Sequence, residues 1–448
     1  MMKQHAIEIV KKLQNAGYEA VFAGGCVRDM LLNRTPHDID IATSAEPQEV
    51  ELLFEKTVPV GKSFGVVRVL VDGFEFEVAT FRMDGNYSDG RRPDNVEFCS
   101  MEEDAKRRDF TINGMFYDPV AVKLLDFVGG EDDLDNGVLK FIGKPALRIK
   151  EDKLRLLRAL RFQAQLGFEF ELEAESWKAV VHHAAKVKEV SVERVFEELT
   201  KMFLCKHPAA VLRQLQNSTL LVHLLPEVGH LINTQQGEQY HPEGDVFEHT
   251  CLVMVHTPPD PVLRWSALLH DIGKPNTYAV RKHKHTFYGH ESVGAVIADK
   301  MLRRFKCSNE FKANVISLVK SHMYFFNMKQ MKKHTLKRFF RQPFYQQAQM
   351  LHKADLLGSC GDLTTYHFAV KKFAELCETL NPPPVLSGYD LIVLGYKPGP
   401  TYRQILTAVE NQQLSGKLTT YEEAVQFVQD NWEVENDELS KRASLFTA

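Results

Sequence analysis

The pattern of apolar and polar residues divides the chain into an N-terminal part with short strands and a longer part with helical spacing. Residues 3–16 repeat apolar side chains at helical spacing and end at Gly17, which predicts an amphipathic helix. Alternation near 66–71 and 74–80 predicts two strands. Residues 148–220 are spaced almost entirely as helices. We therefore expect an α+β fold, with a small head built on a mixed or antiparallel sheet and an elongated, mostly α-helical body.

A glycine pair and two spaced aspartates stand out in the predicted head. If Asp38 and Asp40 lie on one strand, both carboxylates point to one face, because side chains alternate along a strand. Hard cations such as Mg²⁺ prefer such oxygen ligands. Upstream, Gly24 and Gly25 would let the backbone approach a phosphate, and Arg28 would donate to it. Each pattern alone is typical of a turn, but together they predict a site for a metal and a triphosphate.

Two other patterns in the head bear on the same chemistry. Glu75 and Glu77 share one face of a predicted strand, so Glu77 is either a third metal carboxylate or part of a solvent-facing edge pair. The segment at Gly61-Lys62-Ser63 does not form a P-loop, because Lys56 stands where that motif requires glycine. The predicted phosphate site therefore depends on the glycine pair and not on a P-loop.

The segment 148–163 is predicted to form one continuous amphipathic helix. On its surface Asp152 and Arg155 would be neighbours, because they are three residues apart. The Asp152 carboxylate would accept a hydrogen bond and the Arg155 guanidinium would donate one. Cytosine and adenine offer an amino donor beside a ring-nitrogen acceptor and so match this pair, whereas uracil and guanine offer an acceptor beside a donor. A mismatch would leave buried polar groups unpaired, at a cost of about 1–3 kcal/mol each. The alternative is an ordinary surface ion pair.

The net charge limits how this protein could contact nucleic acid, and the cysteine content indicates its cellular compartment. The net charge of −4 means that any nucleic-acid contact must come from local basic patches. The densest patch is 329–341, which either contacts a phosphate backbone or forms a solvated helix face.

Seven scattered cysteines without a C-x-x-C pair predict a reducing compartment. No apolar run is long enough to span a membrane, so we expect a cytoplasmic protein with no membrane partner.

The head motifs resemble those of the class II tRNA nucleotidyltransferase and poly(A) polymerase family. The matching strings are GGCVRD, PHDIDIAT and RRDFTIN, followed by an E-D-x-x-R motif at 151–155. The resemblance implies that Asp38 and Asp40 are catalytic and bind Mg²⁺, and that Asp152 and Arg155 read the incoming base. The residues it implies for nucleotide binding are Gly24, Gly25, Arg28, Arg108, Asp109, Asn113, Asp152, Arg155, Arg158 and Arg161.

Four further segments resemble this family. Its G-K-x-F-G segment, which lies near the triphosphate, is matched by Gly61, Lys62, Phe64 and Gly65. The polar segment 82–98 is expected to be a mobile loop, which the resemblance links to the switch from C to A addition. The stretch 191–204 matches a family helix that we interpret as structural. The tail, which touches tRNA in the family, is matched at Gly388, Asp390, Gly395 and 398–400, whereas Tyr402 replaces its usual glycine.

Histidines and aspartates in the second half resemble those of the HD phosphohydrolases. The string LLHDIGKP supplies adjacent His270 and Asp271. Imidazoles and carboxylates from separate helices suit one or two divalent transition metals, whose bound water would attack a phosphoester. The implied ligands are His249, His270, Asp271 and Asp355 for one metal, and His290 and His322 for a second.

Together the two resemblances imply a tRNA nucleotidyltransferase that adds or repairs the 3′-terminal CCA of tRNA from CTP and ATP without a template. We expect a nucleotidyltransferase head at 1–140, a helical neck at 141–225, an HD domain at 226–365 with phosphohydrolase activity, and a tRNA-contacting helical tail at 366–448. The alternatives are an A-only enzyme, a poly(A) polymerase, and an HD phosphohydrolase whose head only binds RNA.

Overall fold

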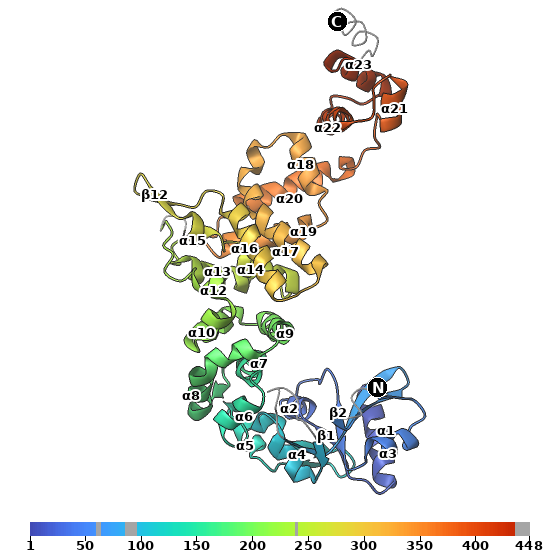
Figure 1. The fold of residues 1–448 in the computed structure, drawn as a ribbon, viewed down its shortest axis with the longest axis vertical. Helices are drawn as coiled ribbons and strands as arrows, with labels where there is room; N and C mark the ends of the chain where they lie inside the picture. The colour runs from blue at the N-terminus through green and yellow to red at the C-terminus, as the bar shows by residue number, and fades with distance from the viewer. Residues whose placement is uncertain (60–63, 86–95, 238–240, 435–448) are drawn as a thin grey trace, which may run out of the picture.

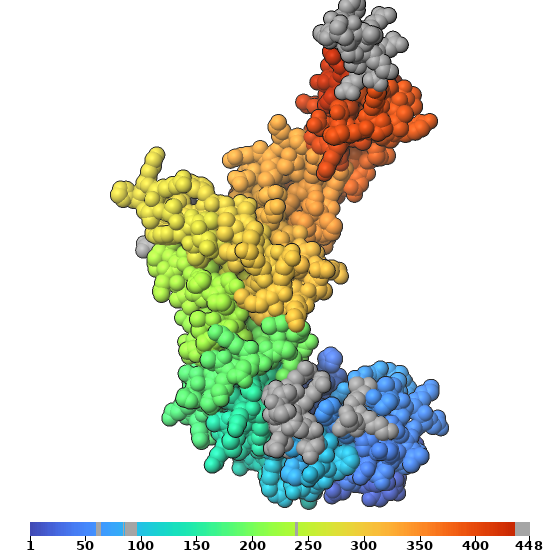
Figure 2. Space-filling model, viewed as in Figure 1, coloured from blue at the N-terminus to red at the C-terminus, as the bar shows by residue number. Residues whose placement is uncertain are grey.

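The computed structural model describes the chain except residues 60–63, 86–95, 238–240 and 435–448. The molecule is elongated and curved, with the sheet-containing head at one end and the C-terminal helices at the other (Figures 1 and 2). Between them, helices follow one another in chain order. The predicted α+β class, with a mixed sheet in the head and a helical body, is therefore confirmed.

The head is built on a seven-stranded sheet in the order β3-β4-β5-β2-β1-β8-β9. Neighbouring strands are antiparallel, except for the parallel pair β2 and β5. One face packs on α1 (Met2–Asn15), and α4 (Met101–Arg107) lies near the apolar cluster of the other face. The strands are β1 (Ala20–Ala23), β2 (Asp40–Thr43), β3 (Thr57–Val58), β4 (Val66–Val71), β5 (Phe74–Thr80), β8 (Phe116–Asp118) and β9 (Lys123–Leu125).

The two aspartates do not share a strand as predicted. Strand β2 begins at Asp40, and Asp38 lies in the bend before it. The reason is that β1 pairs Ala23 with Asp40 and then ends, because the chain turns at Gly24 into α2 (Gly25–Leu31). Alternation nevertheless persists, since Ile39 is buried and the aspartates on either side of it are exposed.

The predicted helix over 148–163 is also wrong, because two helices occupy this segment. Helix α6 (Pro145–Glu151) ends at Asp152, whose φ of −135° and ψ of 109° are extended, and α7 (Arg155–Leu166) begins three residues later. The Asp152 carboxylate accepts a hydrogen bond from the Leu154 N–H at 3.0 Å. Such a side-chain bond competes with helical hydrogen bonding and stabilises the break.

The rest of the body is almost entirely helical. The short strands β10 (Val138–Leu139) and β11 (Glu171–Leu172) pair in parallel, so the region 165–220 contains one strand that helical spacing did not predict. The other head and body helices are α3 (Pro47–Leu53), η2 (Thr111–Asn113), α5 (Gly130–Asp135), α8 (Ala174–His183), η3 (Ala184–Glu189), α9 (Val192–Phe203), α10 (Pro208–Asn217), α11 (Leu220–Leu224), α12 (Pro226–Gly229), α13 (Val246–His256), α14 (Pro261–Leu269), α15 (Lys274–Thr277), α16 (His290–Arg304), α17 (Asn309–Ser321), η4 (His322–Gln330), α18 (Lys333–Phe340), α19 (Tyr345–Leu357), α20 (Thr364–Leu376) and η5 (Cys377–Thr379). One apolar core runs from the head to Leu380.

The last three helices, α21 (Gly388–Val393), α22 (Pro400–Ser415) and α23 (Tyr421–Asn431), build a separate small core. The basic run at 329–341 helps to join them to the body. Its Phe339 and Phe340 are buried, and Arg341 pairs with Glu410 of α22 at 2.7 Å. Tyr402 donates from its hydroxyl to the Tyr396 carbonyl at 2.7 Å, so this residue stabilises the tail fold.

Two of the predicted segments are described only in part. Of the expected mobile loop at 82–98, the ends form the antiparallel strands β6 (Arg82–Asp84) and β7 (Val96–Phe98), and 86–95 lie outside the described residues. Gly61 and Lys62 also lie outside them. Among the described residues, none of the helices combines the length and apolar character that crossing a bilayer requires.

Candidate active sites

A cleft of about 550 Å³ lies between the head, where α2, α4 and the start of β2 line it, and the helices α7 and α9. It brings together Asp40 and every residue predicted to bind the nucleotide, whereas Asp38 is exposed and does not line it. The lining has three aspartates (Asp40, Asp109 and Asp152) and eight arginines: Arg28, Arg82, Arg107, Arg108, Arg155, Arg158, Arg161 and Arg194. Such an excess of guanidinium groups suits a polyphosphate.

The glycine at position 24 is required by the geometry of this cleft. Gly24 precedes α2 with a φ of +75°, where side chains are rarely found. A Cβ there would lie 3.1 Å from Nη1 of Arg108. The turn therefore brings the backbone close to a cleft arginine, while the predicted approach of this backbone to a phosphate stays a prediction.

A chain of polar contacts fixes the orientation of four predicted residues. Arg28 donates from Nη1 to Oδ1 of Asn113 at 2.8 Å, and Asn113 donates to Asp109 at 3.4 Å. The other Asp109 oxygen pairs with Arg158 at 2.6 Å. Burial would raise the pKa of Asp109, but Arg158 and Arg155 outweigh it, so the pKa is lowered and the group is ionised.

Asp104 is a positioning residue of this cleft that sequence reasoning missed. It is buried on α4, and its two oxygens hold Arg107 at 2.7 Å and Arg108 at 3.0 Å. Burial would raise the pKa of Asp104, but Arg108 and Arg107 lower it. The sequence could have revealed this role, because Asp104 lies three and four residues before Arg107 and Arg108 in the charged string 103–109, which is the spacing of neighbours on a helix.

The electrostatics around Asp40 bear on the prediction for Glu77. Strand register pairs Ile41 with Val78, which places Glu77 beside Asp40 on the neighbouring strand. The pKa of Asp40 is raised to about 6, first by burial within the cleft and then by the charges of Asp38 and Glu77. Asp40 keeps solvent-accessible area, so this burial is partial. Glu77 is also exposed and pairs with Arg68 at 3.4 Å, as Glu75 does at 3.1 Å, so both glutamates form the predicted solvent-facing edge pair, and a metal role for Glu77 stays a prediction.

The predicted base-reading pair has unexpected partners. Asp152 is held by Arg194 of α9 at 2.7 Å, and Arg155 is held by Glu151 at 2.5 Å. The ordinary surface pair of Asp152 with Arg155 is therefore not formed among the described contacts. Arg194 was missed because its helix was interpreted as structural, although its E-R string was visible at 193–194.

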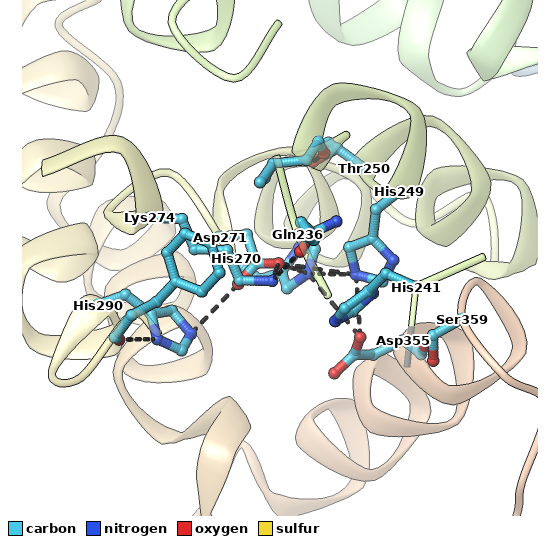
Figure 3. Close-up of polar contacts among 12 residues, drawn as sticks. Gln236, His241, His249, Thr250, His270, Asp271, Lys274, His290, Asp355 and Ser359 are labelled. Atoms are coloured by element: carbon cyan, nitrogen blue, oxygen red, sulfur yellow. Dashed lines mark hydrogen bonds and ion pairs between the residues drawn. The ribbon is translucent and has the colours of Figure 1, made fainter. Parts of the chain in front are cut away.

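The second site is a buried cluster in the HD region, and all six predicted ligands meet there (Figure 3 labels five of them). His249, His270 and Asp355 offer ligand atoms within 4.8 Å of one another, as do Asp271, His290 and His322. The Asp271 oxygens lie 3.2 Å from Nε2 of His270 and 3.2 Å from Nε2 of His290, so this carboxylate joins the two groups.

Backbone contacts orient the imidazoles of this cluster. The Nδ1 atoms of His270, His290 and His322 lie 2.7–2.8 Å from the carbonyls of Ala267, Phe287 and Val319. This arrangement directs each Nε2 toward the centre, where Nε2 of His290 and of His322 are 3.1 Å apart. Imidazoles that are held through Nδ1 and direct Nε2 toward a shared centre are typical of metal ligands, so the donor set fits divalent transition metals.

Three further residues support this cluster and were not predicted as part of it. Glu243 lies 2.8 Å from Nδ1 of His249, and Lys274 lies 2.6 Å from both Asp271 and Gln236. Burial lowers the pKa of His249, but Asp355 and Glu243 outweigh it and raise the pKa to about 9. A cation bound at Nε2 would compete with that proton.

The head topology and its arginine-lined cleft define a nucleotidyltransferase, and the body adds an HD module. Family models match at 20–140 (Poly A polymerase head domain), 169–231 (Probable RNA and SrmB-binding site of polymerase A) and 246–357 (HD domain). The chain is 33% identical to a CCA-adding enzyme of Streptococcus thermophilus over 95% of this chain and 96% of that protein. The chain therefore belongs to the CCA-adding enzyme family.

Other comparisons agree. A CCA-adding enzyme of Streptococcus suis is 32% identical over 94% of this chain and 95% of that protein. The crystal structure of the Bacillus stearothermophilus CCA-adding enzyme in complex with CTP is 26% identical, with a TM-score of 0.72, and covers 96% of this chain and 97% of that one. A Thermotoga maritima CCA-adding enzyme with tRNA, 19% identical at a TM-score of 0.57, shares the fold. These names do not favour the poly(A) polymerase alternative.

Proposed function

We propose that the protein completes or repairs the 3′-terminal CCA of tRNA from CTP and ATP. The observation that carries this proposal is that one cleft joins Asp40 to Asp152 and Arg155, so a nucleotide can meet the carboxylates at one end and the base-reading pair at the other. The family relationship and the CTP complex of the Bacillus stearothermophilus relative support it.

At the catalytic end, Asp38 and Asp40, with Glu77 beside them, are the residues that would hold Mg²⁺. The cation supplies charge stabilisation at the transferring phosphoryl group and its pyrophosphate leaving group. Arg28 and Arg108 bind the triphosphate, while Asn113 and Asp104 keep the two guanidinium groups oriented. The tRNA 3′-hydroxyl attacks the α-phosphate, in line with the bond to pyrophosphate.

At the other end, Asp152 accepts from the exocyclic amino group of cytosine or adenine, and Arg155 donates to the neighbouring ring nitrogen. The contacts of Arg155 with Glu151 and the Arg148 carbonyl both engage Nη1, and Nη2 donates to the Arg107 carbonyl at 3.4 Å, which leaves Nε and the second hydrogen of Nη2 for the base. In uracil and guanine a carbonyl oxygen would face the Asp152 carboxylate and a ring N–H would face the Arg155 guanidinium, so neither hydrogen bond could form. Protein side chains thus replace a nucleic-acid template.

We also propose that the HD cluster hydrolyses phosphoesters with one or two divalent transition metals. His249, His270, Asp271, His290, His322 and Asp355 would hold the metal, which supplies an activated water. Lys274, buried against Asp271, would add positive charge next to a phosphate bound at this site. We place both activities in the cytoplasm, because the described residues form no disulfide bond.

Separate substitutions test the two sites. Asp40→Ala should abolish nucleotide addition and spare phosphoester hydrolysis, whereas Asp271→Ala should do the reverse. Incorporation is measured on tRNA ending at the discriminator base, at C and at CC, with each nucleotide alone, so that an A-only enzyme is distinguished. Asp132→Ala, an exposed aspartate on α5, is the control. Loss of both activities from one folded variant would contradict the two-site assignment.

A further inference from the structure

A β-hairpin beside the HD cluster takes no part in either site. Its strands, β12 (Ala279–Arg281) and β13 (Lys284–Thr286), are antiparallel, and the hairpin projects from the body near α15 (Figures 1 and 2). Lys282 and His283 form its tip with φ values of 49° and 64°. Such turns favour Asn-Gly, and a side chain in this conformation costs about 1 kcal/mol or more. The tip therefore carries Lys282 and His283 in a conformation that Asn and Gly would adopt at lower cost.

The hairpin is basic along its whole length. The 19 residues from 272 to 290 contain no aspartate or glutamate. Arg281, Lys282 and Lys284 are exposed, and within the described parts of the chain no carboxylate pairs with any of them. Three unpaired cations on a projecting element make a binding surface for a polyanion.

Exposed aromatic rings lie among these cations. Tyr288 is 73% exposed, with the Arg281 guanidinium 5.3 Å from its ring centre. Tyr278 is 43% exposed, and its hydroxyl lies 2.9 Å from Nδ1 of His285. Rings of this kind stack on unpaired bases while cations contact the phosphates, which favours single-stranded RNA over a lipid surface or an acidic peptide.

Both ends of the hairpin are attached to the HD cluster. It follows Lys274, which pairs with Asp271, and it leads to Phe287, whose carbonyl faces Nδ1 of His290 at 2.8 Å. The Phe287 ring also lies 5.3 Å from Nζ of Lys274. The base of the hairpin therefore connects Lys274 directly to His290, so a strand held along the hairpin toward its base would approach the cluster.

We propose that the β12–β13 hairpin is an RNA-binding arm that holds the single-stranded 3′ end of an RNA substrate at the HD cluster. Its cations contact the backbone phosphates, and Tyr288 stacks on a base near the terminal phosphate. This inference depends on the proposed hydrolysis for its purpose, but binding can be measured without turnover.

The first test compares substrates of two sizes. In Arg281→Ala/Lys282→Ala/Lys284→Ala, the KM for a six-nucleotide RNA ending in a 2′,3′-cyclic phosphate should rise about tenfold or more, with kcat unchanged. Hydrolysis of bis(p-nitrophenyl) phosphate should be unaffected. Losing three phosphate contacts should lower the slope of log affinity against log salt by about 2. Tyr288→Ala should raise the KM for the RNA at least about fivefold, and Tyr288→Phe should restore it.

The control variant is Lys3→Ala/Lys11→Ala/Lys371→Ala, which removes three exposed cations elsewhere. An RNA KM that is equal in the hairpin and control variants would overturn the proposal. If the unaltered protein hydrolyses neither substrate, the hydrolase assignment alone fails. The RNA-binding role of the hairpin is then tested by the binding measurement.

Binding is measured with a six-nucleotide RNA that ends in a 3′-phosphate, which the head cannot extend, and that carries 4-thiouridine at its last position. Irradiation should crosslink it within 278–288, and the hairpin variant should lose this crosslink. A crosslink only elsewhere would overturn the proposal. So would a hairpin variant that loses binding to anionic vesicles or an acidic peptide but keeps its affinity for RNA.

Discussion

Ion pairing decides which charged side chains of the head cleft are positioned to meet a nucleotide. Asp152 is oriented by Arg194, and Arg107 and Arg108 are oriented by the single buried carboxylate of Asp104. These supporting residues lie near the motif residues only after folding. Their substitution tests whether the cleft selects bases and binds phosphate as proposed.

Arg194 should affect the choice of nucleotide. Without its guanidinium, Asp152 loses a partner and its orientation, so Arg194→Ala should lower discrimination of CTP and ATP against UTP and GTP about tenfold, as ratios of kcat/KM. Arg194→Lys should restore part of it. Arg213→Ala, which breaks an exposed pair with Glu248, is the control. Unchanged ratios in Arg194→Ala would contradict the base-reading role of Asp152.

Asp104 should affect triphosphate binding instead. Asp104→Asn keeps the shape of the side chain but removes the charge that holds two arginines, so the KM for CTP should rise about tenfold. Because the pKa of Asp104 is lowered by folding, the stability it contributes at neutral pH is lost as the pH falls through its folded-state pKa. Unfolding at pH 7 and at about pH 3, which is below the ordinary pKa of an aspartate, should therefore differ less in Asp104→Asn. Glu102→Gln, on the exposed face of α4, should change neither quantity.

Among the elements, α9 connects the two halves of the molecule. Its first turn carries Arg194 to the cleft, and its later turns pack on α14 of the HD region. There Trp265 stacks on Phe196 with ring centres 5.0 Å apart, and its Nε1 donates to Thr200 at 2.9 Å. Trp265 is fully buried and both of its partners are partly buried, so this contact helps to fix how the HD region sits on the neck.

Loss of that contact should destabilise the body. Trp265→Ala removes the largest fully buried side chain, so the free energy of unfolding in urea should fall by about 3–5 kcal/mol. Thr200→Val should cost only about 1 kcal/mol, since it removes mainly hydrogen bonding. A loss below about 1 kcal/mol in Trp265→Ala would show that this contact does not hold the junction together.

On the scale of the whole molecule, the nucleotidyltransferase cleft, the HD cluster and the tail lie in successive parts of a curved chain (Figure 1). The tail has its own core and is joined to α18 through the pairs of Arg338 and Arg341 with Glu410. This arrangement suits an enzyme that contacts a long substrate at several points.

Removal of the tail should therefore affect tRNA binding more than nucleotide binding. A chain ending at residue 384 should keep its KM for CTP, while its KM for tRNA should rise about tenfold, because the phosphate contacts expected of the tail would be lost. Glu410→Gln, which only weakens the joint, should have a smaller effect. An unchanged KM for tRNA would contradict the tRNA-contacting role proposed for the tail.

Local patterns in the sequence determined much of this protein. Alternation and helical spacing predicted the sheet-containing head and the helical body, because those periods depend only on neighbouring residues. The strings around Asp40, Arg108, Asp152 and His270 indicated both sites through their resemblance to known families, and their residue types agree with the chemistry of those families. The single helix over 148–163 was wrong because a side-chain hydrogen bond outweighed helical propensity at Asp152.

Tertiary structure alone decided which distant groups meet. Strand register brought Glu77 beside Asp40, and the packing of α9 brought Arg194 to Asp152. Folding also placed a cationic hairpin beside the HD ligands. Such neighbours are separated by many residues in the chain, and only the burial of a shared apolar core determines the distances between them.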